Sequence, residues 1–114
     1  VWVAERDGEI IGFCNTVPAT EELAGTAELQ TLYLAPEVVG TGKGAALIRC
    51  ALNDLRARGY GAAVLWVLDT NARARRFYEK GGWQADGTEK TEQLWGITVR
   101  EVRYRIALTE SGAR

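Results

Sequence analysis

The sequence contains no histidine. Without an imidazole the chain has no Ser–His–Asp or Cys–His triad and no histidine ligand for a metal ion. Proton transfer in any chemistry it performs therefore has to use carboxylates, phenols or water. The sequence also shows no signal peptide and no apolar run of membrane-spanning length, so we expect a cytoplasmic protein that does not bind a membrane.

Methionine is missing too, and there are only two cysteines. Because the chain starts at Val1, we expect it to be processed or to be part of a longer reading frame. Cys14 and Cys50 fall in a predicted strand and a predicted helix. Small buried thiols in a reducing compartment explain them better than a disulfide or a metal pair, so we expect no metal cofactor.

Neither sign of charge predominates in the chain. Its 114 residues include 14 Lys and Arg against 15 Asp and Glu, which gives a net charge of −1. Such a balance produces no overall field that would attract nucleic acid or a membrane surface, so an anionic ligand has to be bound by a local arrangement of groups. The length fits one domain over residues 1–114.

The first third of the chain predicts three strands. "VWVAERDGEIIGFCNTV" consists of two apolar runs around Asp7 and Gly8, a dipeptide typical of tight hairpins. "TAELQTLYLA" predicts a third strand over about residues 26–35, ended by Pro36. Together these segments predict an antiparallel meander.

Helical and strand patterns alternate in the rest of the chain. Residues 42–58 have a broad apolar helical face that Gly59 ends, and "GAAVLWVLD" is apolar throughout, as in a strand covered on both sides. A second helix follows in "TNARARRFYEKGG", with Thr70 or Asn71 as N-cap. "GGWQADG" and "ITVREVRYRIAL" predict the final strands. The order β-β-β-α-β-α-β-β predicts an α/β fold in which helices flank a mixed, mainly antiparallel sheet.

Glycines cluster just before the first helix, in "LAPEVVGTGKGAALI". Gly40, Gly42 and Gly44 have no Cβ, so an anion can approach the backbone N–H groups of a loop that opens a helix. The partial positive charge of the helix start lies at the same place. We interpret the loop as a site for a phosphate or diphosphate. A glycine turn without a ligand is the alternative.

Two familiar phosphate-binding motifs fit this loop less well. A P-loop requires Lys followed by Ser or Thr, whereas Lys43 is followed by Gly44. "GTGKGA" matches the G-x-G-x-x-A fingerprint of dinucleotide-binding folds. However, a preceding meander of three strands and a chain this short are wrong for a doubly wound fold.

Two longer segments carry a family resemblance. "LYLAPEVVGTGKGAALI", followed by "GAAVLWVLDTNARARRFYEKGGW", resembles the GNAT superfamily of acetyl-CoA-dependent N-acetyltransferases. "VGTGKG", from Val39, matches the family loop except at its first position, where the family has Arg or Gln. Asn71 and Tyr78 match a second motif, Asn followed seven residues later by Tyr. The resemblance covers essentially the whole chain, but the strand and two helices with which members usually begin are missing, so we expect an N-terminally short member.

The resemblance implies a binding site for coenzyme A. Its diphosphate is expected on the backbone of the glycine loop, which consists of Val39, Gly40, Thr41, Gly42, Lys43, Gly44 and Ala45. Its pantetheine arm is expected to pair, like an added strand, with the backbone of Leu32, Tyr33 and Leu34. Val39 removes a polar contact, so we expect weaker binding than in the family, though not its loss, because the backbone amides do most of the work.

Asn71 and Tyr78 lie two helical turns apart, on one face of the second helix. Taken alone, they fit an N-cap and a core aromatic residue. The resemblance implies instead that Asn71 hydrogen-bonds the pantetheine arm and that Tyr78 protonates the departing thiolate. A phenol with a pKa of about 10 is protonated at neutral pH and can donate. Backbone N–H groups near residues 32–34 would stabilise the oxyanion.

Direct attack by an amine also needs a base that deprotonates the ammonium group. With no histidine, a carboxylate or a relayed water has to serve. Glu28, on the third strand, is our candidate, and a solvated strand carboxylate is the alternative explanation for it. Glu21, Glu22 and Asp69 are further candidates.

Two other residue groups have simpler explanations. Arg73, Arg75 and Arg76 suggest phosphate or nucleic-acid binding, but we expect them to form a solvated outer helix face. The four tryptophans are predicted to lie mainly in the core; they are Trp2, Trp66, Trp83 and Trp95. An alternative for Trp95 is that it lines an acceptor pocket together with its loop "TEQLWG".

The sequence therefore predicts an N-acetyltransferase that moves an acetyl group from acetyl-CoA to a primary amine of a small molecule by direct attack. One alternative is a shortened domain that binds coenzyme A, or pairs with another chain, without turnover. A dinucleotide-binding domain is a further alternative. Pairing of an exposed first strand would give a homodimer.

Overall fold

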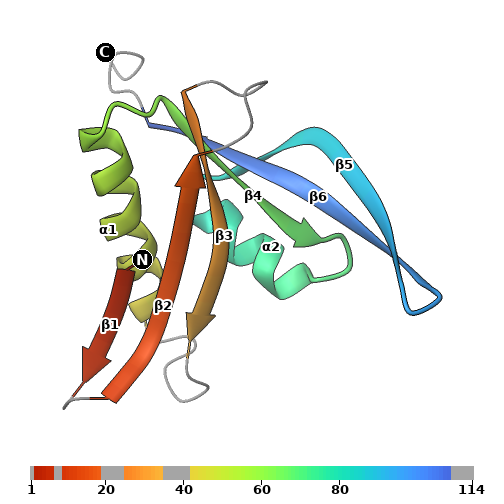
Figure 1. The fold of residues 1–114 in the computed structure, drawn as a ribbon, viewed down its shortest axis with the longest axis horizontal. Helices are drawn as coiled ribbons and strands as arrows, with labels where there is room; N and C mark the ends of the chain where they lie inside the picture. Colours follow the sequence, from red (N-terminus) through yellow and green to blue (C-terminus); the bar gives the residue numbers. More distant parts are fainter. Residues whose placement is uncertain (1, 7–8, 19–24, 35–41, 109–114) are drawn as a thin grey trace. The chain divides into compact units, whose positions relative to one another are not determined.

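The computed structural model describes residues 2–6, 9–18, 25–34 and 42–108. Its elements are β1 (Trp2–Arg6), β2 (Glu9–Pro18), β3 (Thr26–Leu34), α1 (Lys43–Ala57), β4 (Ala62–Leu68), α2 (Ala72–Lys80), β5 (Gln84–Leu94) and β6 (Ile97–Ala107). The predicted order is confirmed, and with it the mixed, mainly antiparallel α/β fold (Figure 1). The chain divides into two compact units, called here unit 1 (residues 1–63 and 107–114) and unit 2 (residues 64–106).

Unit 1 contains the predicted meander. β1 pairs antiparallel with β2, and β2 pairs antiparallel with β3. The dipeptide Asp7-Gly8 lies outside the described residues, but Arg6 is opposite Glu9, as a tight hairpin at that place requires. α1 packs against these three strands and covers the core of the unit.

The apolar face predicted for the first helix is buried at four of its six residues, Leu47, Ile48, Ala51 and Leu55. Leu52, also predicted for this face, is half-buried, and Cys50 is exposed. The spacing of the four buried residues gives one stripe along a helix, and burial of each large side chain in it contributes about 1.5–3 kcal/mol. α1 ends at Ala57, and Gly59 follows with φ 94°, so the predicted glycine stop is confirmed.

The two cysteines differ in burial. Cys14 on β2 is fully buried, as predicted, whereas Cys50 on α1 is exposed. The prediction of burial is therefore wrong for Cys50. Because a helix turns about 100° per residue, Cys50 lies outside the stripe that holds Leu47 and Ala51.

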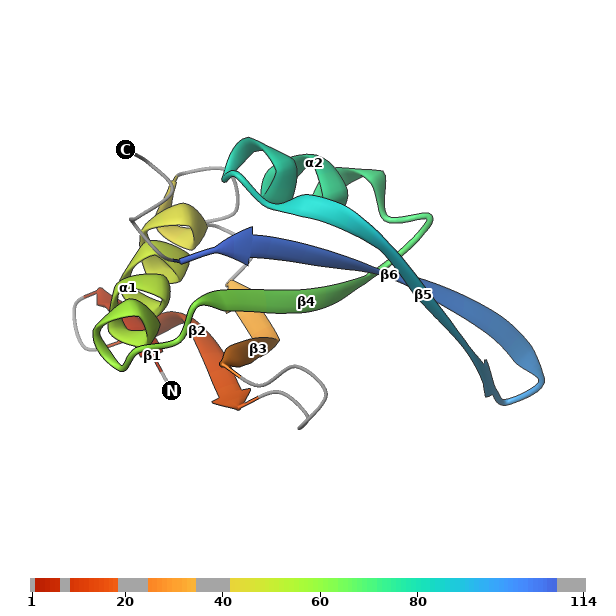
Figure 2. The same ribbon diagram turned by 90° about the horizontal axis from the view of Figure 1, so that it is seen from above.

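In unit 2 the strands follow the order β4-β6-β5. β5 and β6 pair antiparallel, from Gln84 opposite Arg105 to Leu94 opposite Ile97. α2 lies along the part of this hairpin near its open end, and the remaining part runs beyond α2 toward the tip (Figures 1 and 2). The buried side chains of the unit are Val64, Leu65, Val67, Trp83, Val102 and Tyr104. The alternation predicted for the last strand is thereby confirmed at two of its positions.

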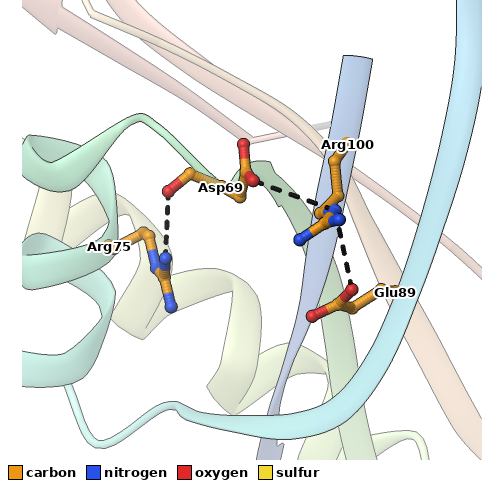
Figure 3. A network of polar contacts seen from close by, with 4 residues as sticks. All are labelled: Asp69, Arg75, Glu89 and Arg100. Carbon is orange, nitrogen blue, oxygen red and sulfur yellow. Dashed lines mark hydrogen bonds and ion pairs between the residues drawn. The ribbon is translucent and has the colours of Figure 1, made fainter. Parts of the chain in front are cut away.

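α2 is tied to the strands of unit 2 by one polar network. The hydroxyl of Tyr104 accepts a hydrogen bond from Arg75 Nε at 2.9 Å and donates one to Glu79 Oε2 at 2.6 Å. Arg75 Nη1 also donates to the carbonyl oxygen of Asp69 at 2.9 Å, and the Asp69 carboxylate lies 4.0 Å from Arg100 Nε (Figure 3). The hydrogen bond with Tyr104 raises the pKa of the Arg75 guanidinium, so this group stays protonated.

The network corrects one prediction about the arginine run. Arg73 and Arg76 are exposed, as expected of an outer helix face, but Arg75 is half-buried. Its partners are 29 and 6 residues away in the sequence, which is why the local pattern did not reveal them.

The tryptophans also differ in burial. Trp83 is buried, Trp66 is half-buried, and Trp95 is 97% exposed, so the core prediction is wrong for Trp95. The predicted loop "TEQLWG" is wrong too, since residues 91–94 belong to β5 and only Trp95 and Gly96 turn. Both have positive φ, 49° and 79°, as a two-residue type I′ hairpin turn requires.

Neither α1 nor α2 has the combination of length and apolar composition that a bilayer-spanning helix needs.

Candidate functional site

Among the described residues, no side chain caps the start of α1. Its N-cap is Gly42, which has no side chain and lies in the left-handed region with φ 88° and ψ −4°. The first intrahelical bond runs from the Ala46 N–H to the Gly42 carbonyl at 3.1 Å. The N–H groups of Lys43, Gly44 and Ala45 therefore have no acceptor within the helix.

This helix end favours a bound anion. The first turn contains no acidic side chain, and the helix dipole adds partial positive charge there. No described heavy atom lies within 4 Å of where a Cβ on Gly42 would stand, but the positive φ of Gly42 disfavours any side chain there. Of the predicted diphosphate loop, Val39, Gly40 and Thr41 lie outside the described residues.

The predicted pantetheine segment lies at the end of β3. Leu32 is opposite Cys14, Tyr33 opposite Phe13, and Leu34 opposite Gly12, all on β2. β2 thus occupies one edge of the segment, and an added strand would have to use the other. In unit 1 the chain runs along β3 in one direction and along α1 in the other, so the end of β3 and the start of α1 lie at the same end (Figure 1).

β3 is irregular just before this segment. Asn15 is opposite Thr31, but the next residue of β2, Thr16, is opposite Leu29, so Gln30 has no partner on β2. Such bulges re-aim side chains and are common beside active sites. Glu28, the predicted base, lies on the far side of the bulge from residues 32–34, opposite Val17 and half-buried.

The other carboxylates considered as bases are Glu21, Glu22 and Asp69. Glu21 and Glu22 are outside the described residues. Asp69 ends up in unit 2, where its carboxylate faces Arg100 and its carbonyl oxygen accepts from Arg75. Asp69 therefore holds the start of α2 to the strands of that unit.

Asn71 is the N-cap of α2. Its side-chain oxygen accepts a hydrogen bond from the Ala74 N–H at 3.1 Å, so of the two predicted caps Asn71 is the one used. The oxygen is engaged in this cap, whereas Nδ2 is the donor that an incoming arm would meet. Asn71 is exposed.

Tyr78 stands two turns further along the same helix. Its half-buried ring meets Phe77 and Trp83 edge to face, with ring centroids 5.2 and 6.0 Å away. Its carbonyl oxygen accepts from the N–H groups of Gly81 and Trp83, at 3.0 and 3.1 Å, where the helix ends. The aromatic ring and the helix stop thus fix the position of Tyr78 from two sides.

The predicted site residues fall into both units. Residues of β3 and the start of α1 belong to unit 1, and Asn71 and Tyr78 belong to unit 2. Sequence analysis did not identify the bulge at Gln30 or the Tyr104 network that anchors α2. No local sequence pattern predicts the bulge. The alternation of the last strand predicted that Tyr104 is buried, but it did not predict which residues Tyr104 contacts. Within the described ranges, no group of three or more Cys, Asp and Glu side chains could hold a metal ion.

Comparison with known proteins identifies the family. Residues 1–83 match the acetyltransferase (GNAT) family, and the chain belongs to it. An uncharacterized N-acetyltransferase of Archaeoglobus fulgidus is 44% identical over 81 residues, which are 68% of this chain and 55% of that protein. A mycothiol acetyltransferase of Acidimicrobium ferrooxidans is 35% identical over 96 residues, 83% of this chain and 31% of that protein. The chain thus spans about half or less of the length of these relatives.

Solved structures agree on the fold. An N-acetyltransferase of Staphylococcus aureus superposes with a TM-score of 0.82 at 19% identity, over 94% of this chain and 66% of that one. A GNAT-family acetyltransferase of Desulfovibrio desulfuricans gives 0.77 at 26% identity, over 94% and 67%. The expected family resemblance is therefore confirmed.

Proposed function

We propose that this chain transfers an acetyl group from acetyl-CoA to the primary amine of a small molecule. The observation that carries the proposal is the start of α1, where the N-cap Gly42 is left-handed and the first turn itself contains no carboxylate. In a member of the GNAT family, such an end favours an anionic cosubstrate bound by backbone N–H groups.

Coenzyme A would be bound mainly through backbone groups. The loop from Val39 to Ala45 would take the diphosphate, with the N–H groups of Lys43, Gly44 and Ala45 as the described donors. The pantetheine arm would pair with the edge of residues 32–34 that β2 does not use, and with Nδ2 of Asn71. An amide-bearing arm suits a strand edge because it offers a donor and an acceptor at the peptide spacing.

The chemistry needs one base, one acid and an oxyanion site. The nitrogen of the neutral amine attacks the thioester carbon, a C–N bond forms and the C–S bond breaks. Glu28, through a water, would take the proton that the nitrogen loses, and the Tyr78 hydroxyl would protonate the thiolate. Asp69 is less suited as the base because Arg100 already faces its carboxylate. Backbone N–H groups near residues 32–34 would stabilise the oxyanion.

Calorimetry and a thiol-release assay test the proposal together. We expect acetyl-CoA to bind and NAD not to bind, and we expect thiol release with some member of a panel of amino sugars, amino acids and polyamines. Binding of acetyl-CoA without release for any acceptor would instead support the shortened binding domain. NAD binding in place of acetyl-CoA would support the dinucleotide alternative.

Tyr78→Phe tests the acid role separately from binding. The variant keeps the ring contacts with Phe77 and Trp83 and removes only the hydroxyl. We expect kcat to fall by about 10²-fold, the lower end of the contribution of general acids, while the Kd for acetyl-CoA stays within a factor of about two. An unchanged kcat would remove the acid role.

A further inference from the structure

The hairpin of β5 and β6 has an open outer edge. Among the described strands, β5 has only β6 as a neighbour. Of its eleven residues from Gln84 to Leu94, every one except Thr88 is exposed. An open edge of this length is a template for pairing with another strand, and natural proteins usually protect such edges with charged side chains, with proline or with bulges.

β5 has a bulge only among its first residues. Ala85 is opposite Tyr104 and Glu89 is opposite Val102, so residues 86–88 bulge against one residue of β6. Arg103 Nε pairs with Asp86 Oδ2 at 2.6 Å in this bulge. From Glu89 to Leu94 the ladder is regular, and the edge there carries charges of both signs.

The register of the hairpin decides which backbone groups face outward. Leu94 and Ile97 close a two-residue turn, so they form a hydrogen-bonded pair. From there, hydrogen-bonded and non-hydrogen-bonded pairs alternate along the ladder, and the backbone groups of a non-hydrogen-bonded pair point away from the partner strand. Arg100, opposite Thr91, confirms this alternation, because its carbonyl accepts from Asp69 at 3.0 Å on the side away from β5. The N–H and C=O groups that point outward from β5 are therefore those of Glu89, Thr91 and Gln93.

We propose that β5 pairs antiparallel with β5 of a second copy of this chain, about a twofold axis at Thr91. This register places Thr91 opposite Thr91, and Glu89 opposite Gln93, so every outward backbone group meets an outward group. It also places Lys90 directly opposite Glu92 of the second copy, and Glu92 opposite Lys90. A twofold axis repeats each contact, so the edge is complementary to itself in charge.

The other twofold registers are worse. An axis at Glu89 puts two like charges directly opposite each other, which destabilises a strand pair. An axis at Gln93 pairs Thr91 with Trp95, which lies beyond the strand, and creates no opposite-charge pair. An axis at Lys90 would place Lys90 opposite Lys90, and an axis at Glu92 would place Glu92 opposite Glu92, so each again puts two like charges directly opposite each other.

The tip of the hairpin also favours a second copy of the chain as the partner of β5. Trp95 is 97% exposed and has φ 49°, a conformation in which Gly and Asn are usual and a bulky residue is strained. The axis at Thr91 brings Trp95 level with Gly87 of the second copy, where an added Cβ finds no heavy atom within 4 Å. The indole of Trp95 could thus pack against the backbone at Gly87 of the second copy and become less exposed. The axis at Thr91 also leaves β1, the strand that the sequence favoured for pairing, unused.

Sedimentation velocity of the whole chain over a dilution series tests the pairing. Glu92→Lys should raise the dimer Kd roughly tenfold or more, because two attractive pairs become repulsive. Glu89→Lys is the matched control, since it makes the same change of charge on the same strand but faces Gln93; its Kd should stay within about threefold of the parent value. The triple variant Lys90→Glu, Glu92→Lys and Glu101→Lys keeps opposite charges at residues 90 and 101 within the hairpin, and it should restore the dimer with the charges exchanged.

A backbone variant tests the axis itself. Thr91→Pro removes an outward N–H that β6 does not use, so the hairpin should remain folded by circular dichroism while the dimer is lost. Thr91→Val should keep the dimer. A chain that is monomeric at its highest soluble concentration would overturn the proposal. So would equal effects of Glu92→Lys and Glu89→Lys, or a failure of the exchanged pair to restore the dimer.

Discussion

The hydroxyl of Tyr104 on β6 donates a hydrogen bond to Glu79 Oε2 on α2 at 2.6 Å, across 25 residues of sequence. Because Tyr104 is fully buried, this bond and the one from Arg75 fix α2 against the strands of unit 2 at a point one residue from Tyr78. A hydrogen bond between a helix and a strand therefore helps to hold the residue proposed as the catalytic acid.

Tyr104→Phe is predicted to lower the free energy of unfolding by about 1 kcal/mol, because it removes the two hydrogen bonds that the buried hydroxyl makes with Arg75 and Glu79. Urea denaturation measures the change. Tyr60→Phe serves as the control, since the described residues offer the Tyr60 hydroxyl no hydrogen bond, and we expect a change within about 0.5 kcal/mol. Equal losses in the two variants would show that the network adds no stability.

The ion pair of Asp86 and Arg103 is predicted to make stability depend on acid pH. Burial by itself would raise the pKa of Asp86, but the Thr88 N–H and the Arg103 guanidinium stabilise the carboxylate more, so its pKa lies below the ordinary value. The unfolded chain then binds this proton more tightly than the folded one. The stabilisation is full above the unfolded pKa of about 4 and is lost as pH falls through the lower, folded pKa.

Asp86→Asn keeps an oxygen for the Thr88 turn and removes the charge. The variant should lose about 0.5–1 kcal/mol at neutral pH and show a smaller further loss between about pH 5 and pH 2 than the parent chain does. Asp54→Asn, which breaks a more exposed pair with Arg58, should change stability by at most about 0.5 kcal/mol. Parallel pH profiles for Asp86→Asn and the parent chain would contradict the assignment.

Ala45→Glu is predicted to move stability and coenzyme binding in opposite directions. A carboxylate in the first turn of α1 should stabilise the helix by about 0.3–1 kcal/mol through its dipole, while it repels the diphosphate. Thermal unfolding and calorimetry with acetyl-CoA measure the two effects. Ala57→Glu adds the same charge at the other end of the helix and should lower stability slightly without weakening binding. Unchanged affinity in Ala45→Glu would place the anion elsewhere.

Asn71 is predicted to have two separable roles. Asn71→Ala loses the bond to Ala74 and should cost about 1 kcal/mol, whereas Asn71→Asp and Asn71→Ser keep an oxygen at the cap and should keep most of the stability. Asn71→Asp nevertheless lacks the Nδ2 donor, so its affinity for acetyl-CoA should fall by about tenfold. If Asn71→Asp binds acetyl-CoA as tightly as the parent chain, Asn71 acts only as a cap.

Trp95→Asn is predicted to stabilise the folded monomer. At φ 49° in a type I′ turn, Asn relieves backbone strain of about 1 kcal/mol that Trp cannot avoid. Thermal unfolding at a concentration where the chain is monomeric should show a higher Tm. Trp95→Phe, which keeps a bulky ring in the same turn, should leave Tm nearly unchanged, and an equal rise in both variants would point to lost surface rather than relieved strain.

Much of the fold was readable from local patterns. The period of apolar residues predicted α1 to within a residue or two, Thr70 or Asn71 predicted the start of α2, and Gly59 stops the first helix as expected. These features depend on propensity, capping and glycine conformation, which act over a few neighbouring residues. The loop glycines and the Asn71–Tyr78 pair also indicated the family before any geometry was known.

Tertiary structure alone decided which side chains are covered and what they meet. Arg75 is in a run of exposed arginines, yet Tyr104 and Asp69 take it inward. Trp95 is a large aromatic residue of a kind that usually lies in the core, yet it forms part of the turn at the tip of a hairpin that runs beyond α2 (Figure 2). Burial depends on partners that are distant in the sequence, and a local pattern contains no information about them.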